Sequence, residues 1–177
     1  MTTPNQLPPR DANGNLIVVV ETPRGSQVKL KYAPDLDAFV WSRRLTLGVS
    51  FPYDYGFVPG TLAEDGDALD AFVFTGVPSY PGVVVPSRIV GALRIEQQRD
   101  GEPVKRNDRL LVVPVNDHRY RSVVDIDDVA SRTREEMEEF CRASLLLTNK
   151  AIELRGWADR AEATELVDVA SKLHNAG

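Results

Sequence analysis

The sequence predicts an α+β protein that is mainly β, with strands in the first two-thirds of the chain and helices in the last third. Short apolar or alternating runs recur between turn signals up to residue 115. This rhythm is typical of a small barrel or sandwich rather than of alternating βαβ units. Beyond residue 133 the apolar side chains recur every three or four positions, which is typical of amphipathic helices.

Six strands are expected, because each apolar or alternating run lies between turn signals rich in glycine, proline, asparagine or aspartate. The expected strands cover residues 15–21, 28–32, 38–41, 70–74, 87–95 and 108–115. The turn signals are Asn13-Gly14, Pro23-Arg24-Gly25, Asp65-Gly66, Pro81-Gly82 and Asp100-Gly101.

Two helices are expected to pack on the strands, without chemistry of their own. Thr133 followed by Glu136 fits a capping box at the start of the first helix. Its periodic face comprises Met137, Phe140, Cys141, Ser144, Leu145 and Thr148. Asp159 is expected to begin the second helix. The apolar face of that helix comprises Ala163, Leu166, Ala170 and Leu173.

The chain of 177 residues is expected to form one domain over residues 15–177, after a polar, flexible segment over residues 1–14. The net charge of −5 supplies no large basic surface, which argues against a nucleic-acid partner. The longest apolar runs are too short to span a bilayer, so no membrane partner is expected. The lone Cys141 excludes an internal disulfide and fits a reducing cytoplasm, and its helical position predicts a core side chain.

Three carboxylates lie within six residues at Asp65, Asp67 and Asp70. Like charges this close repel one another, and a bound cation is the usual relief. Mg²⁺ prefers oxygen ligands and often takes one or two carboxylates together with water and phosphate. An extended chain places Asp65 and Asp67 on the same side, and Asp70 joins them if the chain bends after Gly66.

Two other interpretations of this cluster are an EF-hand and a metal-free turn. A calcium EF-hand is excluded, because the twelfth loop position falls on Gly76 or Pro78 and a strand follows instead of a helix. An exposed Asp-Gly hairpin turn without metal remains open from the residues alone.

The surroundings of the cluster resemble family I soluble inorganic pyrophosphatases. The resemblance is close over the run from Phe51 to Phe57, at Thr61-Leu62 and over residues 65–70. Weaker matches extend it over most of the chain, from Leu16 to Trp157. They lie at residues 18–23, Lys29, Pro81-Gly82, Val90-Gly91 and Gly156-Trp157.

The resemblance implies a five-stranded OB-like barrel flanked by helices, a cytoplasmic location, pyrophosphate as substrate and a homo-oligomer, a hexamer in bacterial members. It implies Mg²⁺ as cofactor, with Mn²⁺, Zn²⁺ or Co²⁺ as alternatives. Carried over by position, Asp67 activates the attacking water, Asp65 and Asp70 bind metal, and Glu21 is an outer carboxylate. Phosphate oxygens are assigned to Lys29, Arg43 and Tyr55, with Arg44 leaving the arginine register open by one residue.

The match breaks at several positions of the family pattern. Lys31 stands where the family has glutamate, and Phe51 lacks a tyrosine hydroxyl. A Tyr-Lys pair of the family falls at Ala143 and Ser144. Alignment back from Leu110 assigns Asn107 to a metal-ligand aspartate and Arg109 to a substrate-binding lysine. Asp108 is a metal ligand instead if the strand shifts by one.

Three hypotheses therefore stand at the level of sequence. The first is metal-dependent hydrolysis of inorganic pyrophosphate to two phosphates, because the aspartate cluster and its basic partners are present. The second is hydrolysis of another phosphoanhydride or phosphate ester, motivated by the lost Tyr-Lys groups. The third is a non-catalytic protein that binds phosphate or only assembles.

Overall fold

Five strands close into a barrel in the computed structural model, which describes residues 3–176. The barrel strands are β1 (Leu16–Thr22), β4 (Asp54–Val58), β5 (Leu69–Val73), β8 (Arg109–Pro114) and β6 (Val84–Arg99). They pair in that order, and pairing between β1 and β6 closes the sheet. The pair β5 and β8 is parallel, whereas the other barrel pairs are antiparallel. The predicted five-stranded barrel is confirmed.

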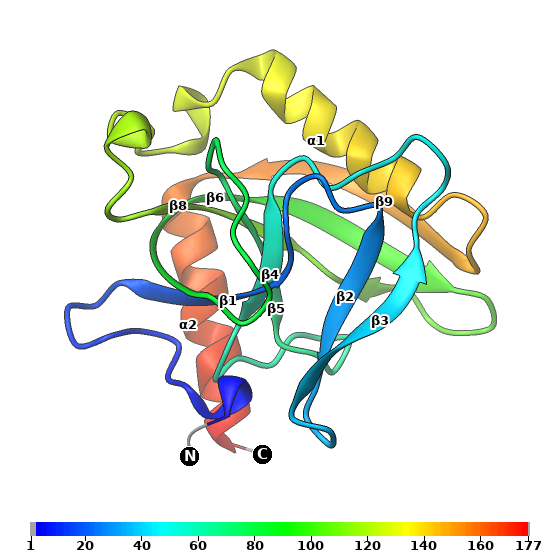
Figure 1. Cartoon of the computed structure of the whole chain (residues 1–177), viewed down its shortest axis with the longest axis horizontal. Coiled ribbons are helices and arrows are strands. Elements are labelled where there is room, and N and C mark those ends of the chain that lie inside the picture. The colour runs from blue at the N-terminus through cyan, green and yellow to red at the C-terminus, as the bar shows by residue number, and fades with distance from the viewer. Residues whose placement is uncertain (1–2, 177) are drawn as a thin grey trace.

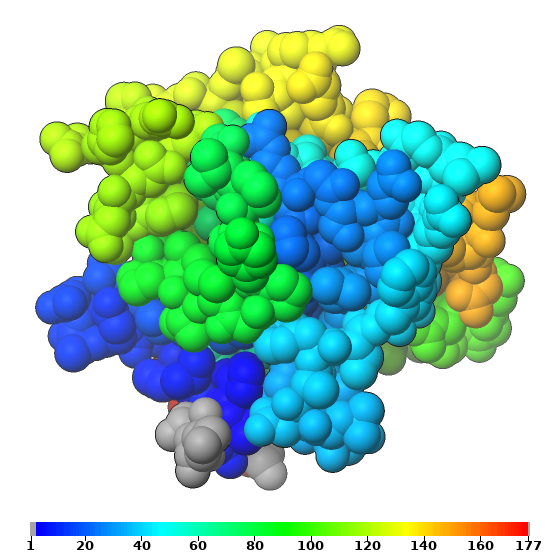
Figure 2. All heavy atoms as spheres, in the orientation of Figure 1, coloured from blue at the N-terminus to red at the C-terminus, as the bar shows by residue number. Residues whose placement is uncertain are grey.

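The long strand β6 extends beyond the barrel and carries further strands. Its distal half pairs with β7 (Lys105–Arg106) and with β9 (Lys150–Ala158). A separate hairpin of β2 (Val28–Ala33) and β3 (Ala38–Arg44) stands beside the barrel (Figure 1). The hairpin reaches the molecular surface next to the loop before β6 (Figure 2). The sequence had not predicted β4, β7 or β9.

Two helices flank the barrel, as expected. The helix α1 (Ser131–Ser144) begins two residues before the predicted Thr133, and its N-cap Ala130 makes no side-chain cap. The predicted capping box is therefore wrong. The helix α2 (Arg160–Ala176) begins as predicted, because the Asp159 carboxylate accepts a hydrogen bond from the Glu162 amide at 2.8 Å. The 3₁₀ turns are η1 (Pro4–Gln6), η2 (His118–Tyr120) and η3 (Ile126–Asp128).

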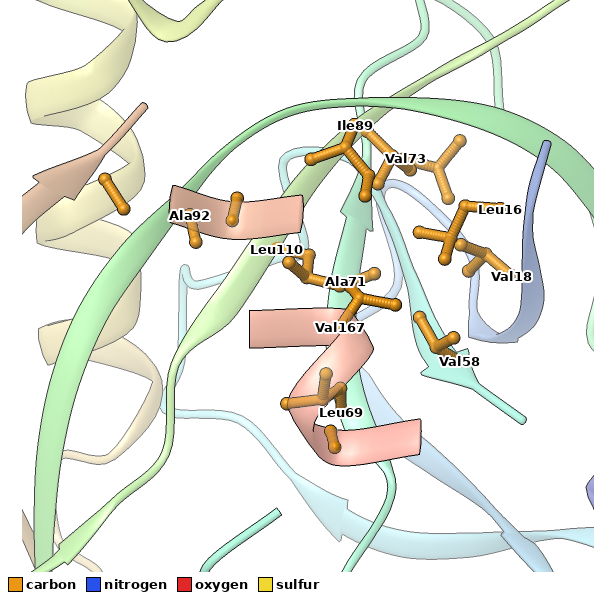
Figure 3. Packing of buried hydrophobic residues seen from close by; sticks show 14 residues of the cluster. Leu16, Val18, Val58, Leu69, Ala71, Val73, Ile89, Ala92, Leu110 and Val167 are labelled. Carbon is orange, nitrogen blue, oxygen red and sulfur yellow. The ribbon is translucent and has the colours of Figure 1, made fainter. Parts of the chain in front are cut away.

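The core has two main clusters that join the helices to the sheet. In one, α2 places Ala163, Val167 and Ala170 against barrel residues such as Leu110 (Figure 3). Val167 replaces the predicted Leu173, which is 51% exposed. The other cluster buries the α1 residues Met137 and Cys141 among aromatic and aliphatic side chains of the sheet, as predicted for Cys141. Burial raises the pKa of the Cys141 thiol to about 12, so this thiol is a poor nucleophile at neutral pH.

The N-terminal residues run along the barrel. The Ile17 amide donates to the Pro9 carbonyl at 2.9 Å, and Arg10 pairs with Asp168 of α2 at 3.2 Å. The division into a flexible segment over residues 1–14 and a domain over 15–177 stays a prediction. Within residues 3–176, no helix is long and apolar enough to cross a membrane.

A glycine in β4 fixes how closely β1 and β4 approach. Gly56 pairs with Val20, and a Cβ built on it would lie 1.9 Å from the Val19 carbonyl oxygen. Because that oxygen belongs to the backbone of a central strand, it cannot move aside without separating the pair. Gly56 therefore holds Tyr55 and Phe57 in register with β1.

We expect Gly56→Ala to lower the free energy of unfolding by more than the roughly 1–3 kcal/mol typical of overpacked cores. The midpoint of thermal unfolding, followed by circular dichroism, measures the loss. Gly76→Ala is the matched control, because its new Cβ would meet only the Tyr120 hydroxyl, at 3.3 Å. Equal midpoints for the two variants would contradict the account of the β1–β4 contact.

Candidate active site

A cleft of about 720 Å³ lies between the β2–β3 hairpin, the loop before β5 and the start of β8. Four carboxylates line it, from Glu21, Asp65, Asp67 and Asp70. Six basic side chains also line it, from Lys29, Lys31, Arg43, Arg99, Arg109 and Lys150. Acids and bases of widely separated segments thus share one concave surface, which is where a small polyanion and a cation could bind together.

The chain bends at Gly66, which is the bend that Asp70 needs to reach the same side as Asp65 and Asp67. Gly66 has a φ of 90°, and the Asp67 amide donates to the Asp65 carboxylate at 3.2 Å. The turn brings Asp65, Asp67 and Asp70 to the same cleft. The part of the chain that the structure describes nevertheless holds no group of three acidic, histidine or cysteine side chains close enough to bind one metal ion. The acids are instead interleaved with basic side chains.

Asp70 is paired with Arg109 across the parallel strands β5 and β8. The two residues are register partners, and Arg109 Nη1 lies 2.9 Å from Asp70 Oδ2. Burial alone would raise the pKa of Asp70, but the charge of Arg109, followed by Lys29 and the Tyr55 hydroxyl, holds it below its ordinary value. Burial alone would lower the pKa of Arg109, but the charge of Asp70, with smaller contributions from Tyr55, Cys141 and Asp65, raises it above its ordinary value.

Tyr55 lies beneath the basic groups. Its ring centroid is 5.3 Å from Lys29 Nζ and 5.9 Å from Arg109 Cζ, within the range of cation–π contacts. The side chain is buried, and burial raises the pKa of its hydroxyl. Tyr55 lines a smaller cavity behind the cleft and not the cleft itself. The nearby Tyr53 packs edge-on against Phe74 and is a core aromatic.

Asp67 is exposed and paired with Lys31. Lys31 Nζ lies 3.0 Å from Asp67 Oδ2, with 63% of the Asp67 side chain and 48% of the Lys31 side chain exposed. An ion pair this open is worth roughly 0–1 kcal/mol. Lys31 therefore holds a positive charge beside the candidate water-activating carboxylate, but the pair can separate at little cost.

Glu21 and Asp65 are the two carboxylates of the cleft without an ion pair among residues 3–176. A β-bulge in β1 between Val20 and Thr22 turns Glu21 toward the cleft, where it accepts a hydrogen bond from the Tyr32 amide at 2.7 Å. Burial, together with the charge of Asp70, raises the pKa of Glu21 to about 7. Burial also raises the pKa of Asp65, and the charges of Asp70 and Asp67 add to the rise.

The hairpin decides which arginine reaches the cleft. Lys29 of β2 is the register partner of Arg43 of β3, and both line the cleft. Arg44 faces Val28, is exposed and does not line the cleft. Burial lowers the pKa of Lys29, although Asp70 opposes the shift. Of the two arginines, Arg43 is the one that lines the cleft, and its contact with phosphate stays a prediction.

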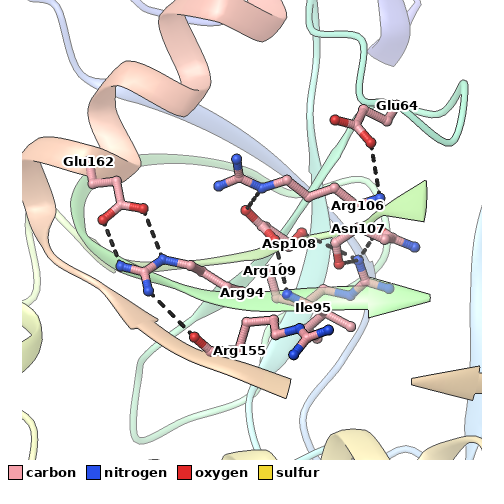
Figure 4. Close-up of polar contacts among 9 residues, drawn as sticks. All are labelled: Glu64, Arg94, Ile95, Arg106, Asn107, Asp108, Arg109, Arg155 and Glu162. Carbon is pink, nitrogen blue, oxygen red and sulfur yellow. Dashed lines mark hydrogen bonds and ion pairs between the residues drawn. The ribbon is translucent and has the colours of Figure 1, made fainter. Parts of the chain in front are cut away.

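Residues 107–109 alternate between two faces of the sheet (Figure 4). Asn107 and Arg109 line the cleft, and the Asn107 side-chain oxygen accepts a hydrogen bond from Arg109. Asp108 points to the opposite face, where its carboxylate accepts from the Ile95 amide at 3.0 Å and from Arg106 Nε at 2.6 Å. The structure therefore does not bring Asp108 to the other predicted ligands.

Some residues that line the cleft belong to no sequence motif and were not among the predicted site residues. Lys150 begins β9, a strand that was not predicted, and Arg99 ends β6 beyond the predicted strand. His174 of α2 also lines the cleft. A lysine at a strand end has no distinctive pattern, so only the three-dimensional arrangement identifies Lys150.

The closed barrel and the charged cleft define an OB-like barrel protein with a site suited to a small polyanion. A family profile described as inorganic pyrophosphatase matches residues 18–175. An inorganic pyrophosphatase of Nostoc sp. is 37% identical over 170 residues, covering 96% of this chain and 98% of its own. The crystal structure of inorganic pyrophosphatase from Thermus thermophilus superposes with a TM-score of 0.90 at 35% identity, covering 98% of this chain and 99% of its own. The chain belongs to the inorganic pyrophosphatase family.

We expect Asp108→Ala to destabilise the fold without weakening Mg²⁺ binding. The side chain is 1% exposed, and its loss leaves the buried Ile95 amide without an acceptor, which costs about 1–3 kcal/mol. Urea unfolding measures the stability, and calorimetric titration measures Mg²⁺ binding. Asp127→Ala, on a 91% exposed side chain, is the control. Unchanged stability together with weaker Mg²⁺ binding would show that Asp108 is a metal ligand.

Proposed function

We propose that this chain hydrolyses inorganic pyrophosphate to two phosphates with the help of Mg²⁺. The observation that carries the proposal is the Asp70–Arg109 pair, which joins the aspartate turn to the basic side of the cleft. A reaction that must neutralise a polyanion and activate water needs both kinds of group in reach of one ligand. The names of the relatives support the same reaction.

The donor set of the cleft fits a hard divalent cation, because its candidate ligands are oxygen atoms. We assign the metal to Asp65 and Asp70, with Glu21 as an outer carboxylate. Mg²⁺ commonly takes one or two carboxylates and completes its shell with water and substrate phosphate, so a preformed cage of three acids is not required. When bound, the ion lowers the pKa of water and polarises phosphate oxygens. Asn107 already accepts from Arg109, so we leave it outside this set.

Asp67 is the group we assign to receive the proton of the attacking water. In the reaction a water oxygen forms a bond to one phosphorus, the bridging P–O bond breaks, and the water proton passes to a carboxylate oxygen. The contact with Lys31 Nζ holds the Asp67 carboxylate at the cleft. Because the pair is exposed and weak, Lys31 can turn to a substrate oxygen when the polyanion arrives.

Lys29, Arg43 and Arg109 are assigned to the phosphate oxygens. Arginine provides a planar fork for two oxygens, whereas lysine acts as a point charge. Tyr55 supports Lys29 and Arg109 from below through its ring, so we assign it to positioning and not to direct phosphate contact. The basic groups together stabilise the negative charge that develops on the leaving phosphate.

Other features of the proposal rest on family resemblance. They are Mg²⁺ in preference to Mn²⁺, Zn²⁺ or Co²⁺, a homo-oligomeric assembly and a cytoplasmic location. Hydrolysis of another phosphoanhydride or ester, or phosphate binding without catalysis, is favoured by no specific observation in the cleft. A panel of phosphate substrates distinguishes these two alternatives from pyrophosphate hydrolysis.

We expect phosphate release from pyrophosphate with Mg²⁺ and its loss in EDTA. Asp67→Asn should reduce turnover at least about 100-fold, the contribution typical of a positioned general base, while leaving the fold intact. Asp127→Asn is the matched control on an exposed aspartate outside the cleft. Full turnover by Asp67→Asn would show that the base is wrongly assigned.

A substrate panel tests the reaction itself. The protein is assayed with pyrophosphate, organic phosphoanhydrides and phosphate esters, each with Mg²⁺, Mn²⁺, Zn²⁺ and Co²⁺. Pyrophosphate should be the preferred substrate. Faster release from an organic phosphate, or no release from pyrophosphate with any of these ions, would defeat the proposed function.

A further inference from the structure

Four basic side chains line both the large cleft and the smaller cavity of about 60 Å³ behind it. They are Lys29, Arg43, Arg109 and Lys150. Within residues 3–176 these four, called here the cation ring, are the residues that line both spaces, so they stand at the boundary between the cleft and the smaller cavity. The four residues come from β2, β3, β8 and β9, which are distant in the sequence.

The positive charge of the cation ring is poorly compensated. Arg109 pairs with Asp70, but Lys29, Arg43 and Lys150 have no ion pair within the part of the chain that the structure describes. Burial lowers the pKa of Lys150, and the charges of Lys29, Arg99, Arg109 and Arg43 lower it further. Several cations therefore lie close enough to repel one another, which an anion bound among them would relieve.

The wall behind the cation ring strengthens this effect. Apart from the four cations, Gln97 and Ser144, the smaller cavity is lined mainly by aromatic and aliphatic residues, among them Phe51, Phe72, Phe140 and Ile152. Such a wall offers the ammonium and guanidinium groups few polar partners and little water. Attraction between these cations and an anion is larger there than on an open surface.

Hydrogen bonds hold the loop before β9, and this loop leads into Lys150, which lines the same two spaces as Lys29, Arg43 and Arg109. The Asp100 amide donates to the Asn149 carbonyl at 3.2 Å, and Thr46 Oγ1 donates to the Leu146 carbonyl at 3.4 Å. Leu147 has a φ of 62°, which is unusual for leucine and turns the chain toward β9. In Figure 2 this segment (orange) lies between the loop after β3 (cyan) and the loop between β6 and β7 (green).

We propose that Lys150 binds a phosphate oxygen together with Lys29, Arg43 and Arg109, and that this cation ring binds phosphate groups without a divalent metal. The identity of the anion, pyrophosphate or its phosphate product, rests on the proposed function. Lys31 and Arg109 already balance Asp67 and Asp70. Among the described residues, the unpaired cations Lys29, Arg43 and Lys150 outnumber the unpaired cleft acids Glu21 and Asp65, so the acids leave the metal-free cleft with an excess of positive charge.

Calorimetric titration in EDTA at low ionic strength tests the proposal. The two probes are inorganic phosphate and methylenediphosphonate, a pyrophosphate analogue that cannot be hydrolysed at its bridge. Lys150→Gln should weaken binding of methylenediphosphonate about tenfold or more, as expected for the loss of one charge-assisted hydrogen bond. Lys150→Arg should stay within about threefold of the unmodified protein, because it keeps the charge.

Lys172→Gln is the matched control, because it removes the same charge from an exposed site on α2 outside both spaces. Circular dichroism melts verify that each variant is folded. Equal affinity of Lys150→Gln and the unmodified protein would overturn the proposal. So would equal losses in Lys150→Gln and Lys172→Gln, or no binding of either probe in EDTA.

The same titrations separate this proposal from the proposed function. Binding that depends on Lys150 in a protein that never releases phosphate from pyrophosphate would support the cation ring and defeat hydrolysis. Hydrolysis with Mg²⁺ in a protein whose metal-free form binds neither probe would support the proposed function and defeat metal-free phosphate binding by the cation ring.

Discussion

The ion pair between Asp70 and Arg109 is the interaction on which the site depends. It spans β5 and β8, which are the parallel pair of the barrel, and the two residues are direct register partners. Through Asp70 the pair holds the turn that carries Asp65 and Asp67, and through Arg109 it holds the basic side of the cleft that Lys29 also lines. Breaking this partly buried pair leaves one charge poorly compensated, and the loss approaches about 3–5 kcal/mol when such a pair is fully buried. The two halves of the cleft are therefore fixed relative to one another by the barrel itself.

The two ion pairs of the cleft differ in a way that suits different roles. Arg109 and Asp70 have side chains only 13% and 20% exposed, whereas Lys31 and Asp67 are open to solvent. The first pair is strongly held and serves the architecture, while the second can exchange partners when a polyanion enters. Because two of the four carboxylates are balanced in this way, the cleft as a whole favours anions. That balance connects the proposed hydrolysis to the cation ring.

The sequence predicts the strands and helices whose apolar residues recur at a regular spacing, and it misses the strands that lack such a spacing. It identified most barrel strands and the start of α2 at Asp159, because apolar alternation and a capping aspartate are local signals. It missed β4, whose five residues are all buried and therefore do not alternate, and β9, which has no preceding Gly or Pro signal. The choice between Asn107 and Asp108 depends on strand register, which a shift of one residue reverses. Lys150 reaches the cleft only through the missed β9.

A double-mutant cycle on Asp70 and Arg109 tests the account most directly. Unfolding free energies are measured in urea for Asp70→Asn, Arg109→Gln and the double variant. Residues in direct contact typically show coupling of about 0.5–3 kcal/mol, and the partly buried pair is expected in the upper half of that range. The account predicts that each single variant loses much of the stability that the double variant loses. Additive losses, with no coupling, would contradict the claim that this pair joins the two sides of the cleft.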